Sequence, residues 1–326
     1  MRIVFTPLIM GKPWCGATVY EAPLGGSESA VVYLAREFAR KGHEVAVFTH
    51  GQPGTYENVK YRPVGELYAG GVPECDVHIS SRWVDIVPNS RGKLKILWLH
   101  DLPPAPEYNL PGDAVVFLSE FQARAWGFAP GARVKIIGDG VDLSLFSGEE
   151  KRDPNRLVWI SNPDRGLYIA CKIFKEEISP RWPDLHLDVY GRYAVYGWGQ
   201  MEESWYLPPR PWLGERIILK DPLPRLALAR ELMRSWAVWY PTYWLETFCM
   251  ATLEAQAAGT PVISSPIGAL TETVKGGILT RDFPNAVSQL RNKSRWNKLS
   301  SAGKAFAQEY SWAKIAEQWE GIWSSG

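Results

Sequence analysis

Two glutamates in one short stretch are the residues whose type and spacing suggest chemistry. Glu246 and Glu254 lie eight positions apart in YPTYWLETFCMATLEAQAAGTPVISSP, residues 240–266. The surrounding pattern predicts, in order, a buried strand over 237–241, a loop with the first acid, a helix over about 248–258 that ends at Gly259, and a second buried strand over 261–264.

Both carboxylates would lie near the N-terminus of that helix. Unpaired backbone N–H groups and the helix dipole favour an anion such as phosphate there. Sugar or ribose hydroxyls suit a buried carboxylate, because a buried acid without a hydrogen-bond partner costs stability. A plainer interpretation stays open on spacing alone, in which one acid stabilises the helix start and the other is solvated.

Composition narrows the class of protein. The chain has 326 residues, which favours two domains, and its 36 basic and 35 acidic residues give a net charge of +1. No field that would recruit nucleic acid is expected. The four cysteines form no CxxC pair, which is typical of reduced thiols in a cytosolic protein, and the five histidines show no metal-ligand spacing. We therefore expect no bound metal and a cytoplasmic location, with neither a signal peptide nor a transmembrane helix.

The first part of the chain predicts a βαβ unit. A strand over 2–8 is followed by a Gly/Pro-rich loop, a helix over 27–41 and a strand over 44–50. The turn before the helix contains Gly25 and Gly26 but does not read GxGxxG, so the dinucleotide fingerprint is absent. This absence argues against a dehydrogenase, which is the first alternative function.

Further alternation of strands and helices predicts an open α/β sheet, with His100 at the end of one strand. A histidine there is more often packed than catalytic. Residues 138–154 combine glycines, charges and a proline, and we interpret them as a linker between domains. A second α/β set follows, with a strand over 156–161 and a helix over 167–177. Two such halves would form a ligand cleft between them.

Taken together, these residues resemble the family 4 retaining glycosyltransferases of the GT-B fold (glycosyl transferases group 1), over nearly the whole chain. The most specific match is ETFCMATLEAQAAGTP at 246–261, which is similar to the family's Glu-x7-Glu motif with its EAxAxGxPV continuation. Gly25-Gly26 with its helix and GDGVD at 138–142 are weaker matches in the expected order. Residues 310–323 look like the terminal helix that crosses back to the first domain.

The resemblance implies a fold class and a division of the chain. The fold would be α/β of GT-B architecture, with two Rossmann-like domains that face each other across a cleft. An acceptor domain would comprise residues 1–142 together with a C-terminal helix over about 310–326. A donor domain would comprise residues 143–309. The ligands would be a nucleotide-sugar donor and an acceptor that is a glycan, a lipid-linked glycan or a small molecule, with no further cofactor.

The resemblance also implies roles for particular residues. In the donor domain, Glu254 would hold the ribose hydroxyls. Glu246 and the backbone of Thr247, Phe248 and Cys249 would hold the sugar hydroxyls and the phosphate. Retention in the family is usually explained by attack from the front face, with no enzymic nucleophile, so Glu246 would bind and not form a covalent bond.

In the first domain, Gly25 and Gly26 would let the backbone approach the diphosphate, because a Cβ there would obstruct it. His100 matches the family's histidine near the transferred sugar. With Glu246 and Arg165, it completes the expected catalytic set.

One segment departs from the family pattern. Where relatives show G-R-x(4–5)-K-G, this chain reads ISNPDRG at 160–166. Arg165 takes the place of the lysine, whereas Ser161 or Asn162 stands in place of the arginine. One phosphate cation is therefore missing, unless Lys172 or Arg192 supplies it.

Several alternatives remain open at this point. The lost arginine and the aromatic segment at 193–212 are compatible with a sugar-nucleotide or glycan-binding protein without catalysis, and an epimerase or phosphorylase would share the fold. The aromatic segment would gate the cleft or stack on an acceptor, or simply pack locally. Peripheral contact with the inner face of a membrane stays open. The base, the sugar and the acceptor are not indicated.

Overall fold

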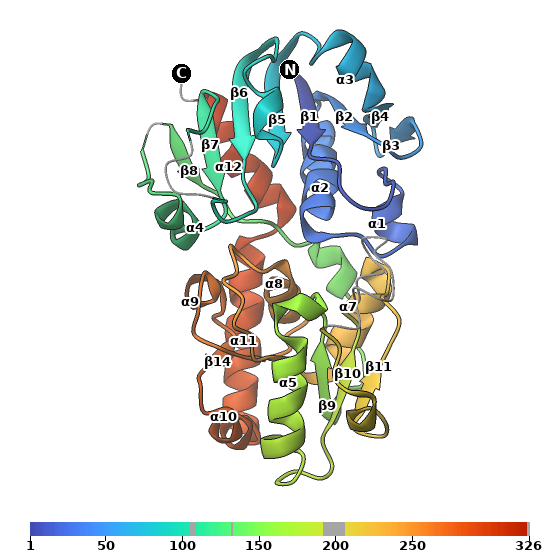
Figure 1. The fold of residues 1–326 in the computed structure, drawn as a ribbon, viewed down its shortest axis with the longest axis vertical. Coiled ribbons are helices and arrows are strands. Elements are labelled where there is room, and N and C mark those ends of the chain that lie inside the picture. Colours follow the sequence, from blue (N-terminus) through green and yellow to red (C-terminus); the bar gives the residue numbers. More distant parts are fainter. Residues whose placement is uncertain (105–108, 132, 192–205, 325–326) are drawn as a thin grey trace. The chain divides into compact units, whose positions relative to one another are not determined.

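The structure is a computed structural model that describes residues 1–104, 109–131, 133–191 and 206–324. The chain divides into two compact units (Figure 1). Unit 1 comprises Met1–Gly140 and Tyr310–Gly326, and unit 2 comprises Val141–Glu309. Each unit is built around its own sheet and is described by itself.

The sheet of unit 1 has the strand order β3-β4-β2-β1-β5-β6-β7-β8. All the described pairings are parallel except that of β3 with β4. β1 lies in the middle of the sheet, and its apolar sequence RIVFTP is buried after the first residue, as expected for a strand covered on both faces. The strands are β1 (Arg2–Pro7), β2 (Glu44–Thr49), β3 (Gly54–Tyr56), β4 (Val59–Pro63), β5 (Cys75–Ser81), β6 (Gly92–Trp98), β7 (Ala114–Phe117) and β8 (Val134–Ile136).

Two helices from distant parts of the sequence pack together in unit 1. α2 (Gly26–Arg40) follows the Gly25-Gly26 turn, and α12 (Trp312–Ser324) lies against it (Figure 1). The rings of Tyr33 and Trp312 stack with centroids 5.9 Å apart. Shorter helical segments complete the unit: α1 (Thr18–Glu21), α3 (Gly65–Gly70), η1 (Val84–Ile86) and α4 (Glu120–Ala125).

Unit 2 contains a six-stranded sheet in the order β11-β10-β9-β12-β13-β14, with parallel pairing throughout its described part. The carboxyl ends of parallel strands lie along one edge, so the loops that follow β9 and β12 lie close together. The strands are β9 (Asp153–Trp159), β10 (His186–Val189), β11 (Ile217–Leu219), β12 (Ser235–Tyr240), β13 (Val262–Ser264) and β14 (Gly277–Leu279).

The helices of unit 2 pack against the strands of this sheet and against one another. α8 (Met250–Ala257) is mostly buried, and α11 (Lys293–Glu309) packs against it. The remaining segments are η2 (Leu143–Phe146), η3 (Pro163–Arg165), α5 (Leu167–Ile173), the π-helix η4 (Phe174–Ile178), η6 (Arg210–Trp212), α7 (Arg225–Arg234), α9 (Leu270–Thr273) and α10 (Phe283–Leu290).

Most predicted elements are present with ends shifted by a few residues, and three differences from the prediction have a clear structural cause or place. β9 begins at Asp153, inside the expected linker, because Asp153 already pairs with Ser235 of β12. α8 begins at Met250 and not near 248, because Cys249 has a left-handed backbone. In the aromatic segment predicted to be an extended loop, Arg210–Trp212 forms a 3-10 turn, and residues 192–205 lie outside the described residues.

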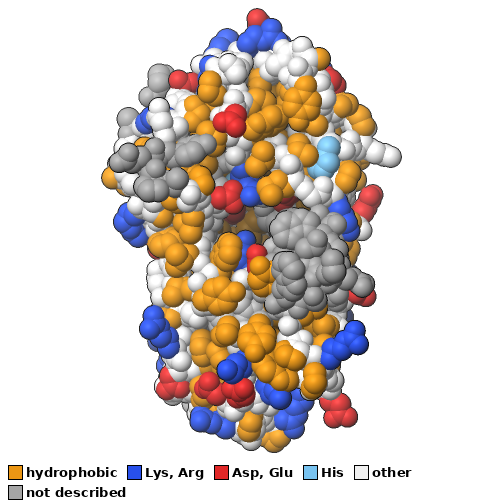
Figure 2. Space-filling model, viewed as in Figure 1, with side chains coloured by type: hydrophobic (Ala, Val, Ile, Leu, Met, Phe, Trp, Pro, Cys, Tyr) orange, Lys and Arg blue, Asp and Glu red, His pale blue; other side chains and the backbone are white. Residues whose placement is uncertain are grey.

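The surface agrees with the balanced composition. In the face shown in Figure 2, the side chains of Lys and Arg and those of Asp and Glu are scattered among hydrophobic ones, and neither sign of charge covers a large continuous area. Among the described residues, no helix is both long enough and apolar enough to cross a membrane.

Candidate functional site

Arg165 and Glu246 form an ion pair at the carboxyl edge of the unit 2 sheet. Arg165 ends η3 after β9, and Glu246 lies in the loop after β12. The Arg165 Nη1 atom is 2.7 Å from Glu246 Oε2, and the two side chains are 28% and 5% exposed. The guanidinium also lies over the Trp244 ring, 4.7 Å from its centroid. The structure thus brings together two residues that were predicted to act in one site.

Tyr240 contacts the other oxygen of the same carboxylate. Its hydroxyl donates to Glu246 Oε1 and lies 3.2 Å from Ser161 Oγ. Burial, followed by the charge of Glu246, raises the pKa of Tyr240 well above its usual value, so the hydroxyl keeps its proton. Sequence reasoning treated Tyr240 only as a strand residue, because nothing in a buried run distinguishes a tyrosine with a polar partner.

The backbone of Glu246 is held by the segment before α9. Ala269 N donates to Glu246 O at 2.9 Å. A Cβ on Gly268 would lie 2.8 Å from both the N and the O of Glu246, and Gly268 has φ +55°. This position therefore requires glycine on both steric and conformational grounds.

The turn between Glu246 and α8 consists of Thr247, Phe248 and Cys249. Thr247 is half-buried, whereas Phe248 and Cys249 are buried. The Phe248 carbonyl accepts a hydrogen bond from Thr273 Oγ1 at 2.9 Å. Cys249 has φ +79°, a conformation that costs a non-glycine residue about 1–3 kcal/mol. Burial raises the pKa of its thiol, which is therefore protonated and packs as an apolar group.

Glu254 has a different partner. It lies in the second turn of α8, and Arg225 Nη1 donates to its Oε1 atom, with side-chain exposures of 11% for Arg225 and 9% for Glu254. Burial raises the pKa of the Glu254 carboxyl above its usual value, and Arg225 opposes this shift. Arg225 was missed at the sequence level. One signal was present: it is the first residue of α7, where the helix dipole disfavours a cation that has no acidic partner.

The remaining predicted residues belong to unit 1. Gly25 caps α2, followed by Gly26, and His100 comes just after β6. Arg82 connects the residues that follow Gly26 and His100 in the sequence. It donates to Ser27 Oγ at 3.3 Å and to Asp101 Oδ2 and Oδ1 at 2.7 and 3.0 Å. The Gly25-Gly26 turn and His100 therefore lie at the same edge of unit 1.

His100 packs against Trp98, with ring centroids 4.5 Å apart. Burial, followed by the charge of Arg82, lowers the pKa of His100 well below its usual value. The imidazole is therefore neutral at pH 7 and provides one donor and one acceptor nitrogen.

The structure shows where the residues lie that stand in place of the family's arginine. Ser161 follows β9 and contacts Tyr240, while Asn162 caps η3. Lys172 is exposed in the last turn of α5, at the end of that helix away from Arg165. Arg192 lies outside the described residues. Arg225 is another cation of unit 2, its side chain is 11% exposed, and it is held by Glu254.

Comparison with solved structures defines the class of fold. The chain matches sucrose-phosphate synthase from Thermosynechococcus elongatus with a TM-score of 0.74, at 17% identity over 100% of this chain and 99% of that one. It matches the Anabaena protein HepE in complex with UDP-glucose with a TM-score of 0.72, at 16% identity over 100% of both chains. The predicted fold class is confirmed: the chain has the GT-B fold, with two parallel-sheet α/β domains.

Sequence comparison adds the family that unit 2 resembles. Residues 154–293 match the family model described as Glycosyl transferases group 1. A D-inositol 3-phosphate glycosyltransferase of Kribbella flavida is 25% identical over 211 residues, which are 57% of this chain and 49% of that protein. The chain thus spans about half the length of this relative. The matched segment contains Arg165, Arg225, Glu246 and Glu254.

Proposed function

We propose that the chain is a glycosyltransferase that moves a sugar from a nucleoside-diphosphate sugar to an acceptor hydroxyl. One observation carries the proposal. In unit 2, two buried carboxylates flank the N-terminus of α8, each paired with an arginine, within the segment that matches Glycosyl transferases group 1. This arrangement offers acceptors for sugar and ribose hydroxyls beside cationic groups for a diphosphate.

The proposed reaction proceeds with retention at the anomeric carbon, as in family 4 enzymes. The acceptor oxygen forms a bond to the anomeric carbon as the bond from that carbon to the diphosphate oxygen breaks. The acceptor proton passes to the leaving diphosphate, and a nucleoside diphosphate is released. Positive charge develops on the sugar and negative charge on the diphosphate, so fixed cations near the latter lower the barrier.

The residues then have distinct tasks. Glu254 accepts hydrogen bonds from the ribose, while Arg225 keeps its carboxyl ionised. Arg165 faces the diphosphate and supplies charge that a metal ion supplies in other transferases, so we propose a reaction without metal. Thr247, Phe248 and Cys249 contribute backbone groups at the start of α8. From unit 1, Gly25 and Gly26 approach the diphosphate, and the neutral imidazole of His100 binds near the transferred sugar.

A donor panel tests the proposal. The protein is incubated with UDP-, GDP- and ADP-sugars in the presence of EDTA, and the release of nucleoside diphosphate is measured alongside thermal shifts. We expect one donor class to stabilise the protein and to be slowly hydrolysed. No release and no shift with any donor would contradict the proposal. Binding without release, with acceptors supplied, would favour the alternative, a sugar-nucleotide-binding protein without catalysis.

The acceptor and the stereochemistry require a second experiment. The proposed acceptor is a glycan, a lipid-linked glycan or a small molecule, and the curated relative is named for an inositol phosphate. With the selected donor and an acceptor library, we expect the product to keep the anomeric configuration of the donor. Proton NMR of the new glycosidic linkage measures this, and an inverted linkage would contradict retention. We propose a cytoplasmic location, with membrane contact if the acceptor is lipid-linked.

A further inference from the structure

Four side chains of unit 2 form one continuous row of polar contacts. Ser161 Oγ lies 3.2 Å from the Tyr240 hydroxyl, which donates to Glu246 Oε1. The other oxygen, Glu246 Oε2, accepts from Arg165 Nη1 at 2.7 Å. Because the carboxylate is engaged at both oxygens, its orientation is determined from two sides.

The inner part of this row is buried and rigidly supported. Tyr240 is 2% exposed and Glu246 is 4% exposed. The Glu246 backbone is bonded to Ala269 and closely approached by Gly268. A carboxylate held in this way presents Oε2 to a guanidinium in one place.

Arg165 is the exposed end of the row. Its side chain is 28% exposed, and its guanidinium is bounded by Glu246 on one side and by the Trp244 ring, 4.7 Å away, on another. Its backbone carbonyl accepts from the Thr242 hydroxyl, so the main chain is fixed as well. Of these four side chains, Arg165 is therefore the one suited to meet an anion.

We propose that Tyr240 and Glu246 are positioning residues that hold the Arg165 guanidinium toward the diphosphate of the donor. This inference rests on the proposed function and revises the role of Glu246, which would act through Arg165 in place of binding the sugar directly. A cation that is already oriented needs little reorganisation as charge develops on the leaving group. Such fixation has particular value in a chain whose matching loop carries one arginine where relatives carry two cations.

The test removes one oxygen atom. In Tyr240→Phe, the carboxylate loses one partner and Arg165 gains freedom. We expect kcat for donor turnover to fall about tenfold to a hundredfold, the range for a lost hydrogen bond to a charged group, with a smaller change in KM. In ¹⁵N-arginine-labelled protein, the Arg165 guanidinium signals, assigned from their loss in Arg165→Lys, should change from restricted to rapid rotation.

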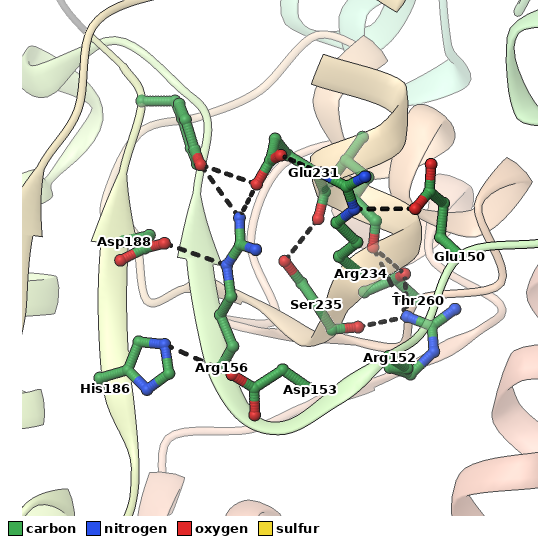
Figure 3. A network of polar contacts seen from close by, with 12 residues as sticks. Glu150, Arg152, Asp153, Arg156, His186, Asp188, Glu231, Arg234, Ser235 and Thr260 are labelled. Atoms are coloured by element: carbon green, nitrogen blue, oxygen red, sulfur yellow. Dashed lines mark hydrogen bonds and ion pairs between the residues drawn. The ribbon is translucent and has the colours of Figure 1, made fainter. Parts of the chain in front are cut away.

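The fold offers a matched control. In a separate network of the same unit, the Tyr190 hydroxyl donates to Glu231 Oε2 at 2.9 Å and accepts from Arg156 Nη2 at 3.0 Å. Figure 3 shows Glu231 and Arg156 together with Asp188 in this network, where Arg156 Nε lies 3.0 Å from Asp188 Oδ2. Tyr190→Phe removes a hydroxyl from a set of one tyrosine, one glutamate and one arginine, as Tyr240→Phe does. We expect a comparable loss of stability but unchanged kcat and unchanged Arg165 signals.

The outcomes separate the two proposals. Arg165 signals that stay restricted in Tyr240→Phe overturn the positioning role, whatever the rate does. If Tyr240→Phe does not fold, Glu246→Gln, which keeps the side-chain volume, must release Arg165, and a restricted signal there overturns the role equally. A wild-type protein that binds and hydrolyses no donor refutes the proposed function, while the guanidinium signals still decide whether Tyr240 and Glu246 hold Arg165.

Discussion

At the scale of single residues, the two acids of the candidate site differ in what surrounds them. Glu246 is bound by a tyrosine and an arginine, whereas Glu254 is bound by Arg225 in a buried setting that raises its pKa. Removing one partner of a buried ion pair leaves an uncompensated charge, which costs about 3–5 kcal/mol. The arginines are therefore as informative to mutate as the acids.

Arg225→Met should make nucleotide binding more sensitive to acid. A carboxyl with a raised pKa becomes protonated at a higher pH, and the protonated form is a weaker acceptor for ribose hydroxyls. Without Arg225, the pKa of Glu254 rises further. Titration calorimetry with the nucleoside diphosphate selected by the donor panel, between pH 5 and 8, should show affinity lost at higher pH than in wild type. The control is Arg230→Met, which changes an exposed arginine of the same helix. If wild type and Arg225→Met lose affinity over the same pH range, the prediction is contradicted.

Cys249→Gly should be more stable than Cys249→Ala by about 1 kcal/mol, because only glycine adopts φ +79° without strain. Both substitutions remove the same buried sulfur and differ from each other by one methyl group, so a second buried cysteine is needed to separate the backbone effect. Cys171, buried in α5, gives the opposite control, since glycine within a helix is about 1 kcal/mol worse than alanine. Urea denaturation measures all four variants, and the same order at both sites would refute a strained Cys249.

At the scale of elements, the loops after parallel strands build the candidate site, and neighbouring segments support them. The loop after β12 carries Glu246, and the segment between β13 and α9 packs against its backbone through Gly268 and Ala269. The geometry of the acid therefore depends on a segment whose contacts with Glu246 are made by backbone atoms.

Gly268→Ala should lower both stability and donor turnover. The new Cβ would lie 2.8 Å from the backbone N and O of Glu246, so the loop must shift, at a cost of about 1–3 kcal/mol beyond the strain of φ +55°. Gly42→Ala is the control, because Gly42 also has a positive φ, +88°, but nothing lies within 4 Å of its added Cβ. Melting temperatures and kcat are compared, and equal losses in both variants would argue against the close contact.

The elements were largely predictable and the side-chain partners were not. Apolar runs such as RIVFTP and SWAVWY determine buried parallel strands almost alone, so the GT-B fold follows from pattern and motif. The short strands β3 and β4 were missed. β3 has only three residues, and the alternation of buried and exposed residues in β4, VKYRP, extends over only five. The partnership of Arg225 with Glu254 spans 29 positions and two helices, and such distances depend on packing that spacing does not encode.

At the scale of the molecule, each unit has its own core. The core of unit 1 includes α12, which is separated in sequence from the rest of that unit by the whole of unit 2. Trp319 and Trp312 of α12 are 0% and 2% exposed, and Trp319 packs edge-on against Trp98 of β6, with centroids 5.0 Å apart. Glu320 of α12 adds an ion pair to Lys41 and a polar contact with His43, whose Nε2 lies 2.8 Å from Glu320 Oε1. The chain leaves unit 1 after Gly140 and returns to it at Tyr310.

Trp319→Ala should therefore destabilise unit 1 alone. Truncation of a buried tryptophan costs about 3–5 kcal/mol. Hydrogen exchange should accelerate in α2 and β6 and stay unchanged in α8 and β12. Trp239→Ala in β12 is the reciprocal control, because Trp239 is equally buried and belongs to unit 2. Faster exchange in both units from either substitution would contradict independent cores.

The return of α12 has a consequence for how the protein is made. Translation produces the whole of unit 2 between the two parts of unit 1, so the ribosome has synthesised β9 to α11 before α12 exists. Unit 2 is continuous in sequence and can fold as it emerges from the ribosome. Unit 1 lacks α12 until the last part of the chain is made, so the face of α2 that binds α12 stays uncovered until then. We therefore expect the order of folding during synthesis to be the reverse of the order in the sequence, with chaperone contacts concentrated on the early, incomplete unit.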